Sequence, residues 1–521
     1  MGRYFGTDGF RGEYGRELTD AHAELIGRFL GEFYGNRFEE NESADCQKAE
    51  KIHSEIKTNR AETGTFSKEK GKIRLDFSEG KSENKLGFSE GKSEVKRARI
   101  LIGRDTRASS ENLEAALIRG IRAAGGEAFS LGVCTTPAVA FLARKFYDDA
   151  AVMITASHNP WRDNGIKIFD RCGQKISEEI TEKIEDFIDE NFQSAPNVPI
   201  DERKENRDVF CKENSEIISS GASENRADFA AESTEIYEEH LCSFGADFSG
   251  LRIGLDCANG AAFATAPRVF RRLGAEVFTI GTEPDGENIN RGIGSTNISA
   301  LMNFVVENEL DLGFAFDGDG DRCITVNRNG QVLDGDCEML NLALDLLSRG
   351  ELKGGKIALT VMSNLGLLRE LEAHEIGAEI CPVGDRFVAE KMRELGLRLG
   401  GEQSGHIIIG DEVTGDGILT AICLARIFSE RGFLWKFLPT PQVSENVSVR
   451  EKGRIMGDER LSFLLRKLEN SLHGEGRILL RPSGTENLIR IMVEHQNTEK
   501  CKLIVSKIGN LVRKIDEEEI L

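Results

Sequence analysis

The feature that most constrains the fold is a repeated alternation of apolar runs and amphipathic helices along a chain of 521 residues. ARILIGRD (98–105) reads as a buried strand, and SSENLEAALIRGIRAAGG (109–126) reads as a helix that glycines close. The same order returns from LRIGLDCANG (251–260) and from GGKIALTVMS (354–363). A chain of this length exceeds what one hydrophobic core can hold, so we expect roughly three or four units around a cleft.

Composition shifts along the chain indicate where these units begin and end. We expect an α/β fold with three mixed α/β domains of largely parallel sheets and a smaller C-terminal α+β domain, all around a central cleft. The expected boundaries are a first domain at 1–190, a polar linker or insertion at 191–232, and further domains at 233–350, 351–438 and 439–521.

A polar stretch at residues 36–97 interrupts the first domain between a helix and a strand. It is poor in aliphatic residues, and its Lys and Arg nearly balance its Asp and Glu. An approximate eleven-residue repeat places Phe66, Phe77 and Phe88 in register. Either a mobile arm or a docked β-hairpin fits this pattern, and the shortage of apolar area favours the arm.

The charge and the hydropathy pattern exclude several classes of partner. A formal net charge of −21 argues against non-specific binding to nucleic acid or to a membrane surface, because both need a basic field. No run approaches the roughly 18 apolar residues that cross a bilayer, and MGRYFGTDGFRG lacks an apolar signal core. We therefore expect a cytoplasmic protein. Eleven cysteines without a CxxC pair favour buried free thiols over disulfides or zinc.

Three alternating aspartates form the strongest chemical signal. Asp317, Asp319 and Asp321 lie in DGDGDR directly after the apolar strand LGFAF, where ligands gather in α/β sheets. Residues two apart point the same way in an extended loop, and the glycines between them let the carboxylates converge on Mg²⁺. An EF-hand is excluded because its twelfth position is Arg328 instead of Glu. A solvated acidic turn is the remaining alternative.

A second turn, TASHNPWRDNG, also follows an apolar strand and contains Ser157. Asn159 and Pro160 close the turn tightly. No GxSxG elbow surrounds the serine, and the turn by itself fits a structural role as well as a chemical one.

Two further segments carry polar groups that suit a phosphosugar. RPSGTENLIR offers anion-binding groups in an acidic chain, and GEQSGH offers a carboxylate and a hydroxyl for vicinal sugar hydroxyls. An ordinary turn between strands is the alternative for each. The groups are Arg481, Ser483, Gly484, Thr485 and Arg490 in the first segment, and Glu402, Ser404 and His406 in the second.

FGTDGFRG, TASHNP, DGDGDR, GEQSGH and RPSGTENLIR occur in this order, and together they resemble the α-D-phosphohexomutase superfamily. FGTDGFRG at the extreme N-terminus, GEQSGH, VGDRFV and PDGENINRGIGST look most like the phosphoglucosamine mutase branch. The resemblance covers nearly the whole chain outside residues 36–97 and 191–232. It implies four domains around one cleft, each of which contributes one loop.

The resemblance also implies roles for single residues. It makes Ser157 the phosphoserine and, with the three aspartates, part of the Mg²⁺ site. Arg11 and Lys167 become catalytic candidates, and either Lys167 or His158 would move the proton of the sugar hydroxyl. The implied substrate-binding residues are Arg322, Asp385, Arg386, Glu402, Ser404, His406, Arg481, Ser483, Gly484, Thr485 and Arg490.

The implied reaction interconverts glucosamine 6-phosphate and glucosamine 1-phosphate, and it feeds UDP-N-acetylglucosamine synthesis. A hexosamine 1,6-bisphosphate is the intermediate, and we also consider it as an activator. The same chemistry on glucose or mannose phosphates is the nearest alternative, and a non-catalytic phosphosugar sensor is a distant one. The intact set of reactive groups favours catalysis. We expect a phosphosugar ligand, no nucleic-acid or membrane partner, and consider a homodimer.

Overall fold

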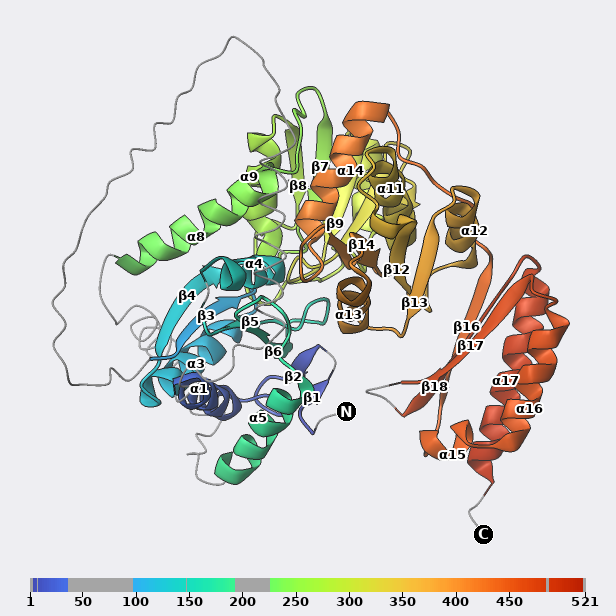
Figure 1. The fold of residues 1–521 in the computed structure, drawn as a ribbon, viewed down its shortest axis with the longest axis horizontal. Coiled ribbons are helices and arrows are strands. Elements are labelled where there is room, and N and C mark those ends of the chain that lie inside the picture. The colour runs from blue at the N-terminus through green and yellow to red at the C-terminus, as the bar shows by residue number, and fades with distance from the viewer. Residues whose placement is uncertain are drawn as a thin grey trace.

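The computed structural model describes residues 3–6, 8–35, 97–146, 148–192, 225–483 and 487–518, and only the backbone of 225–228. The predicted repeat around Phe66, Phe77 and Phe88 and most of the predicted linker at 191–232 lie outside these residues. Four sheets build the described chain, and each falls within one of the predicted domains (Figure 1).

The first sheet lies between two layers of helices. Its strands are β1 (Phe5–Gly6), β2 (Gly9–Glu13), β3 (Arg99–Arg104), β4 (Glu127–Val133), β5 (Ala150–Ile154) and β6 (Asp163–Asp170), in the order β1-β2-β6-β5-β3-β4. Its helices are α1 (Asp20–Gly35), α3 (Ser110–Ala123), α4 (Thr136–Phe146) and α5 (Glu178–Asn191). Ile100 and Ile102 of β3 pack with α1, α3 and α5, whereas Leu101 packs with α4, as expected of a strand that is buried on both faces.

The second and third sheets follow the same plan with fewer strands. The second contains β7 (Arg252–Asp256), β8 (Glu276–Ile280), β9 (Leu312–Phe316), β10 (Cys323–Asn327) and β11 (Val332–Leu333), in the order β11-β10-β9-β7-β8. The third contains β12 (Lys356–Thr360), β13 (Gly377–Cys381), β14 (Leu399–Gly401) and β15 (Ile407–Ile409), in the order β13-β12-β14-β15. Their helices are α8 (Asn225–Cys242), α9 (Thr265–Arg272), α10 (Ser299–Glu307), α11 (Gly335–Ser348), α12 (Leu365–Ala373), α13 (Asp385–Leu395) and α14 (Gly417–Arg431).

These three sheets are more mixed than the alternation of strands and helices predicts. β3, β7 and β12 each pair in parallel with two neighbours. β6, β10 and β15 instead pair antiparallel with the strand before them. The reason is that each of these pairs is joined by a short loop without a crossover helix. These loops carry TASHNP, DGDGDR and GEQSGH, so the motifs lie at the carboxyl ends of β5, β9 and β14.

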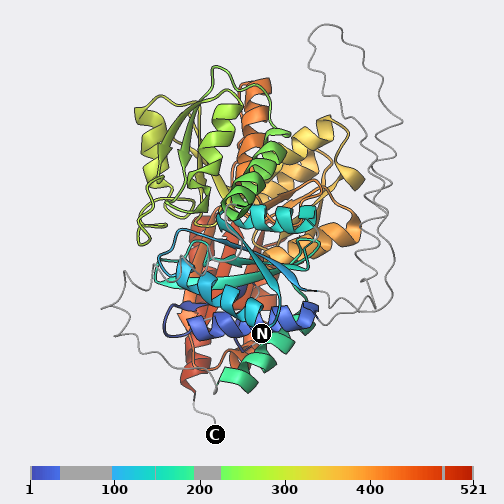
Figure 2. The same cartoon turned by 90° about the vertical axis from the view of Figure 1, so that its left-hand side faces the viewer.

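The fourth sheet is entirely antiparallel and has its own core. Its strands lie in the order β16 (Gln442–Ser448), β18 (Leu488–His495) and β17 (Gly476–Pro482). Ile489, Ile491 and Val493 alternate along β18 and enter this core. The helices α15 (Lys452–Met456), α16 (Glu459–Ser471) and α17 (Thr498–Glu517) cover the side away from the other sheets (Figure 1). In the view of Figure 2 this domain lies behind the first sheet. The predicted smaller α+β domain is confirmed.

The first three domains share one continuous core. It includes Phe141 of α4, Phe314 of β9 and Ile418 of α14. Helix α14 follows the third sheet in sequence but packs on β9 and β10, and α11 contacts both β10 and β14. The described parts of these domains are therefore joined by shared helices.

The second polar segment ends earlier than the sequence predicts. Residues 225–232, which fall in the predicted linker at 191–232, form the start of α8. The reason is that Phe229 contacts the rings of Phe129 and Phe146 in the first domain. Helix α8 consequently packs against β4 on one side and α9 on the other.

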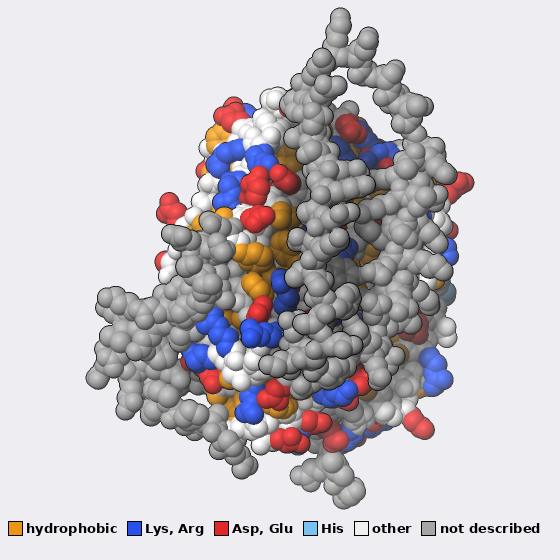
Figure 3. All heavy atoms as spheres, turned by 60° about the vertical axis from the view of Figure 1, so that its left-hand side comes forward, with side chains coloured by type: hydrophobic (Ala, Val, Ile, Leu, Met, Phe, Trp, Pro, Cys, Tyr) orange, Lys and Arg blue, Asp and Glu red, His pale blue; other side chains and the backbone are white. Residues whose placement is uncertain are grey.

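The described helices and the surface charge agree with the charge and hydropathy pattern of the sequence. No helix among the described residues combines the length and apolar character needed to cross a bilayer. Figure 3 shows Lys and Arg interspersed with Asp and Glu on one face.

Eight described cysteines are free thiols, and seven of these are buried. Cys172 is disulfide-bonded, so the prediction of free thiols is wrong there; it lies in a partly exposed turn after β6 instead of an apolar stretch.

Candidate functional site

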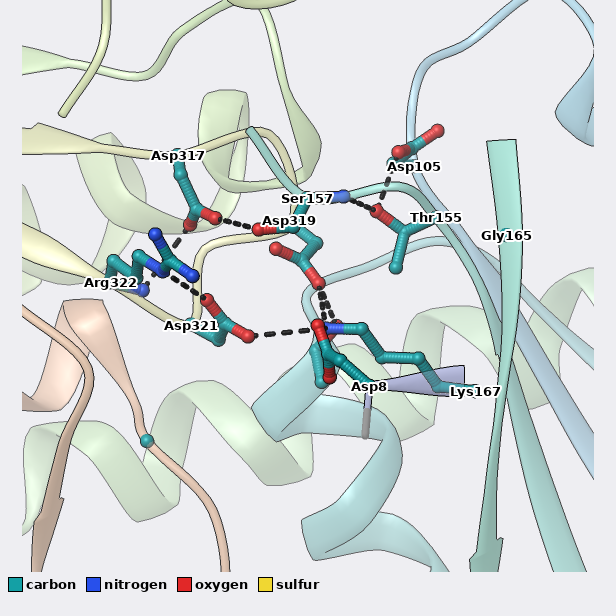
Figure 4. Close-up of polar contacts among 12 residues, drawn as sticks. Asp8, Asp105, Thr155, Ser157, Gly165, Lys167, Asp317, Asp319, Asp321 and Arg322 are labelled. Carbon is teal, nitrogen blue, oxygen red and sulfur yellow. Dashed lines mark hydrogen bonds and ion pairs between the residues drawn. The ribbon is translucent and has the colours of Figure 1, made fainter. Parts of the chain in front are cut away.

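Ser157 lies in the loop between β5 and β6 and is fully buried. Its hydroxyl donates a hydrogen bond of 2.6 Å to Oδ2 of Asp317 and lies 3.3 Å from Nδ1 of His158. Figure 4 shows the serine and Asp317 facing each other from different loops. The backbone φ of Ser157 is +52°, a left-handed conformation that costs a residue with a Cβ about 1–2 kcal/mol. The surrounding structure must therefore hold this conformation in place.

Glycines let the motif loops of the first three domains touch. A Cβ at Gly318 would lie 2.4 Å from the carbonyl oxygen of Ser157. A Cβ at Gly405 would lie 1.9 Å from the carbonyl oxygen of Cys323. Only a residue without a Cβ permits such close approaches of two backbones. The glycines of DGDGDR and GEQSGH thus bring the loops together as well as shaping them.

The three aspartates converge as predicted. Carboxylate oxygens of Asp317, Asp319 and Asp321 all lie within 4.8 Å of one another, and all three residues are buried. Burial excludes the alternative of a solvated acidic turn. Helix α4 begins at this loop: the N–H of Thr136 donates to the carbonyl of Asp319 at 2.9 Å, and its hydroxyl donates to Oδ2 of the same residue at 2.5 Å. The first domain therefore fixes the aspartate loop of the second.

The aspartate cluster is suited to a divalent metal ion. Its donors are hard carboxylate oxygens, which Mg²⁺ and Ca²⁺ prefer. Oδ1 of Asp319 and Oδ1 of Asp321 are buried and have no hydrogen-bond partner among the described residues. Burial and the charges of the two neighbouring aspartates raise the pKa of Asp317 well above its usual range. A bound cation would relieve this repulsion and use the unpaired oxygens.

Lys167 reaches the aspartates from the middle of β6 (Figure 4). Its Nζ lies 2.8 Å from Oδ2 of Asp319, 3.2 Å from Oδ2 of Asp321 and 3.5 Å from Oδ2 of Asp8. Burial opposes the charge of Lys167, but these carboxylates outweigh it and raise its pKa well above the usual range. Lys167 is therefore an ammonium at neutral pH, placed beside the serine and the aspartate cluster.

Lys167 also belongs to a closed ring of alternating basic and acidic side chains from three domains. The ring runs through Lys167, Asp8, Lys175, Asp385, His406, Asp321 and back to Lys167. Nζ of Lys175 lies 2.5 Å from carboxylate oxygens of both Asp8 and Asp385. His406 continues the ring at 3.9 Å from Asp385 and 3.6 Å from Asp321. Each lysine of the ring has carboxylates on both sides, as burial requires. Nε2 of His406 accepts a hydrogen bond of 3.0 Å from the N–H of Gly415, so this imidazole is not counted as a charge.

Arg11, Arg322 and His158 complete the surroundings of the serine. The backbone N–H of Arg322 donates to Oδ1 of Asp317 at 3.2 Å, and Arg11 forms an ion pair with Asp8. Burial, followed by the charges of Arg322 and Arg11, lowers the pKa of His158 to about 4. The imidazole next to Ser157 is therefore neutral at neutral pH.

The predicted sugar-binding residues separate into two groups. Glu402 accepts a hydrogen bond of 3.1 Å from the N–H of Gly384, and Ser404 is exposed, so both lie on accessible loops of the third domain. Asp385 and His406 belong to the ring of basic and acidic side chains. Arg386 instead pairs with Glu178 at 2.9 Å and with Glu390 at 2.8 Å. The structure does not bring the Arg386 guanidinium to the aspartates.

The fourth domain presents two arginines on neighbouring strands. Arg481 of β17 and Arg490 of β18 are direct register partners. Burial and the charge of Arg490 lower the pKa of Arg481, while Glu402 of the third domain opposes this shift. Adjacent cations of this kind favour an anion between them. The pair therefore fits the predicted phosphate site.

The turn beside these arginines is described only in part. Ser483 is buried, its N–H donates to the carbonyl of Leu488 at 2.9 Å, and its carbonyl accepts from Nζ of Lys452 at 2.8 Å. Gly484 and Thr485 lie outside the described residues.

Sequence reasoning missed several residues that hold the site together. Asp8 and Asn290 belong to the motifs FGTDGFRG and PDGENINRGIGST. These motifs marked the two positions, but the sequence did not indicate what either side chain does. Arg107 and Lys175 follow strands as ordinary basic residues, and no spacing marks them. Their roles depend on contacts between distant segments.

Family models for all four domains of phosphoglucomutase/phosphomannomutase match the chain in order. The alpha/beta/alpha domains I, II and III match residues 85–195, 237–330 and 334–438, and the C-terminal domain matches residues 444–510. The match to domain III includes α11, which the sequence prediction assigned to the second domain at 233–350.

Curated relatives match most of the chain. The phosphoglucosamine mutase of Clostridium acetobutylicum is 41% identical over 426 residues, which cover 80% of this chain and 91% of that protein. The phosphoglucosamine mutase of Lachnoclostridium phytofermentans is 36% identical, and the alignment covers 98% of each protein.

Solved structures share the fold. A phosphoglucomutase/phosphomannomutase family protein from Burkholderia thailandensis aligns over 100% of both chains, with a TM-score of 0.66 at 20% identity. The N-acetylphosphoglucosamine mutase of Aspergillus fumigatus, in complex with GlcNAc-6P and magnesium, aligns over 73% of this chain and 92% of its own, with a TM-score of 0.55 at 16% identity. The resemblance seen in the motifs is thus confirmed, and this chain is an enzyme of the phosphoglucomutase/phosphomannomutase family, the α-D-phosphohexomutases.

Proposed function

We propose that this protein interconverts glucosamine 6-phosphate and glucosamine 1-phosphate through a phosphoserine at Ser157 and a glucosamine 1,6-bisphosphate. The observation that carries the proposal is the 2.6 Å hydrogen bond from Ser157 to Asp317, in a buried site that also contains Asp319, Asp321 and Lys167. The amino sugar is proposed because relatives that are 41% and 43% identical bear the name phosphoglucosamine mutase.

Asp317, Asp319 and Asp321 would hold Mg²⁺, with the oxygen of Ser157 beside them. When bound, the metal supplies positive charge where phosphoryl transfer builds negative charge on the equatorial oxygens. Lys167 adds a second positive charge at the same place, because its surrounding carboxylates keep it protonated.

The first transfer breaks the bond between phosphorus and Oγ of phosphoserine 157. A new bond forms from phosphorus to the free hydroxyl of the sugar phosphate, which loses its proton. The serine oxygen gains a proton in turn. The neutral imidazole of His158 can accept the hydroxyl proton at its unprotonated nitrogen, and the ammonium of Lys167 can donate a proton to the serine oxygen. The second transfer reverses both proton movements.

The second transfer returns the other phosphate of the bisphosphate to Ser157. The intermediate must therefore turn around while it stays bound. Arg481 and Arg490 suit this step, because a pair of guanidinium groups can bind whichever phosphate lies far from the serine. Glu402 and Ser404 would hydrogen-bond the sugar hydroxyls between the two phosphate sites. The cytoplasmic location and the homodimer stay predictions.

A substrate panel tests the proposal. We expect kcat/KM to be highest for glucosamine 6-phosphate when glucosamine, glucose and mannose phosphates are compared with saturating Mg²⁺. Ser157→Ala should remove ³²P labelling from the bisphosphate and lower turnover by about 10⁴-fold or more, as loss of a nucleophile does. A higher kcat/KM for glucose or mannose phosphate would overturn the amino-sugar part, and full activity of Ser157→Ala would overturn the phosphoserine.

A further inference from the structure

The carbonyl oxygen of Ser157 is held by side chains from two domains. Nη2 of Arg107 donates to the carbonyl oxygens of Ser157 and Asn159, each at 2.9 Å. Nδ2 of Asn290, from the second domain, donates to the same two oxygens at 2.9 and 3.1 Å. A carbonyl oxygen has two lone pairs, so these two donors satisfy the oxygen of Ser157 completely.

Arg107 spans the whole serine loop. Its Nη1 donates to the carbonyl oxygens of Pro160 and of Asp163, the latter at 3.0 Å. The side chain is almost fully buried, at 1% exposure, and its Nε donates to Oδ2 of Asp105 at 2.9 Å. One guanidinium therefore fixes four backbone carbonyls of the loop, a geometry that the planar fork of Arg allows and an ammonium does not.

The N–H of Ser157 is linked to the carboxylate of Asp105 through Thr155. It donates to Oγ1 of Thr155 at 2.9 Å, and this hydroxyl donates to Oδ2 of Asp105 at 2.7 Å (Figure 4). Asp105 also accepts from the backbone N–H of Arg107 and from the hydroxyl of Ser110, both at 3.0 Å. Both peptide groups of Ser157 are therefore tied to Asp105, one through Thr155 and one through Arg107.

We infer that Arg107 and Asn290 are positioning residues that aim the phosphoryl group carried by Ser157, an inference that rests on the proposed phosphoserine. Fixing both peptide groups fixes the direction of the bond from Cα to Cβ, and one rotamer about this bond brings Oγ to its hydrogen bond with Asp317. Without these donors the backbone of Ser157 is free to leave φ +52° for the favoured negative region, and Oγ would turn away from the aspartates.

Neither residue contacts Oγ in the described structure, so their effect on the reaction passes through the backbone. A purely structural role would lower stability and leave the transfer step unchanged. A positioning role changes kcat, because a misplacement of about 1 Å costs about 100-fold in rate. The two roles therefore differ in a measurable way.

The test compares Arg107→Lys and Asn290→Ala with Arg104→Lys. Arg104 lies three residues before Arg107 and pairs with Glu111 and Glu114 of α3, away from the serine loop. We expect kcat to fall about 100-fold in Arg107→Lys and about 10-fold in Asn290→Ala, with KM within about threefold of wild type. Arg104→Lys should lower the melting temperature and keep kcat.

³¹P NMR of the phosphorylated enzymes gives the second measurement. We expect one narrow phosphoserine resonance in wild type and Arg104→Lys, and a shifted or broadened one in Arg107→Lys and Asn290→Ala. If Arg107→Lys does not fold, Asn290→Ala decides alone, since it removes a neutral side chain. The inference is overturned if both kcat and the phosphorus resonance match those of Arg104→Lys. Absence of any phosphoserine resonance in active wild-type enzyme would instead overturn the proposed function.

Discussion

The serine loop and the arginine pair of the fourth domain are held in opposite ways. Ser157 lies where the first two domains meet, and buried side chains from both of them fix its backbone. Arg481 and Arg490 lie in a domain that has a separate core. The backbone of the proposed phosphoserine is thus fixed by buried side chains, whereas the arginines proposed to bind the far phosphate lie on a domain with its own core.

The joint between the third and fourth domains is centred on Asn364. Its Oδ1 accepts from the N–H groups of Gly366 and Thr440, each at 2.8 Å. Its Nδ2 donates to the carbonyl of Thr440 at 3.1 Å and to Oε1 of Glu494 at 3.0 Å. A small polar joint between two separate cores suits rotation of one domain against the other. The proposed bisphosphate, which would have to turn around in the site, needs such freedom on one side only.

Loss of the metal ion at the aspartates beside Ser157 has the largest expected effect. Removing the metal with EDTA, or the substitution Asp319→Asn, should lower kcat by about 10²–10³-fold, because the transferred oxygens lose their counter-charge. Mg²⁺ at 100 times its Kd should stabilise wild type by about 2.7 kcal/mol and leave Asp319→Asn unchanged in thermal unfolding. Asp411→Asn, the same change at an exposed position, is the control. A Mg²⁺-stabilised Asp319→Asn enzyme would contradict the assignment.

The substitution Arg481→Ala tests the arginine pair of the fourth domain. It should raise KM by about 10–100-fold, the value of a hydrogen bond to a charged group, and change kcat less. Steady-state kinetics with glucosamine 6-phosphate measure both constants. Arg466→Ala, an exposed arginine of the same domain, should match wild type. A 10–100-fold fall in kcat with KM unchanged would place Arg481 in the transfer step. It would then no longer differ in role from the residues around Ser157.

The substitution Asn364→Ala weakens the joint itself. It removes the N-cap of α12 and leaves buried partners in the fourth domain unpaired, so we expect a loss of about 2 kcal/mol in the combined free energy of unfolding of the third and fourth domains. Limited proteolysis should then cut between the third and fourth domains, while labelling of Ser157 by the bisphosphate persists. Cleavage at the wild-type rate would show that other contacts carry the joint.

Asp336 makes the stability of the joint depend on pH, and the change expected over one pH unit is the smallest of these effects. Burial raises its pKa to about 7, against the hydrogen bond from the N–H of Asn364. Between the unfolded pKa of about 4 and this value, only the folded state holds the proton, so stability falls as pH rises through this range. The slope is at most about 1.4 kcal/mol per pH unit. The difference in unfolding free energy between wild type and Asp336→Asn should show this slope, and a flat difference would contradict it.

The sequence predicts the chemistry of the site better than the way it is supported. Local spacing is enough for Asp317, Asp319 and Asp321, because their convergence depends on one loop. The left-handed backbone of Ser157 depends on Asn290, which is 133 residues away, and no local pattern contains that contact. Strand direction was mispredicted in part for a similar reason. Alternation favours parallel pairing, but the short loops that carry the motifs permit only antiparallel neighbours.

The close approach of Gly318 to the carbonyl of Ser157 has a consequence for the order of synthesis. Ser157 leaves the ribosome 160 residues before Asp317, the acceptor of its hydroxyl hydrogen bond. The aspartates, Asn290 and the glycine that admits the serine loop all arrive with the second domain. A nascent or truncated first domain therefore lacks Asp317 and Asn290, and the proposed phosphoserine site is complete only when the two domains have folded together.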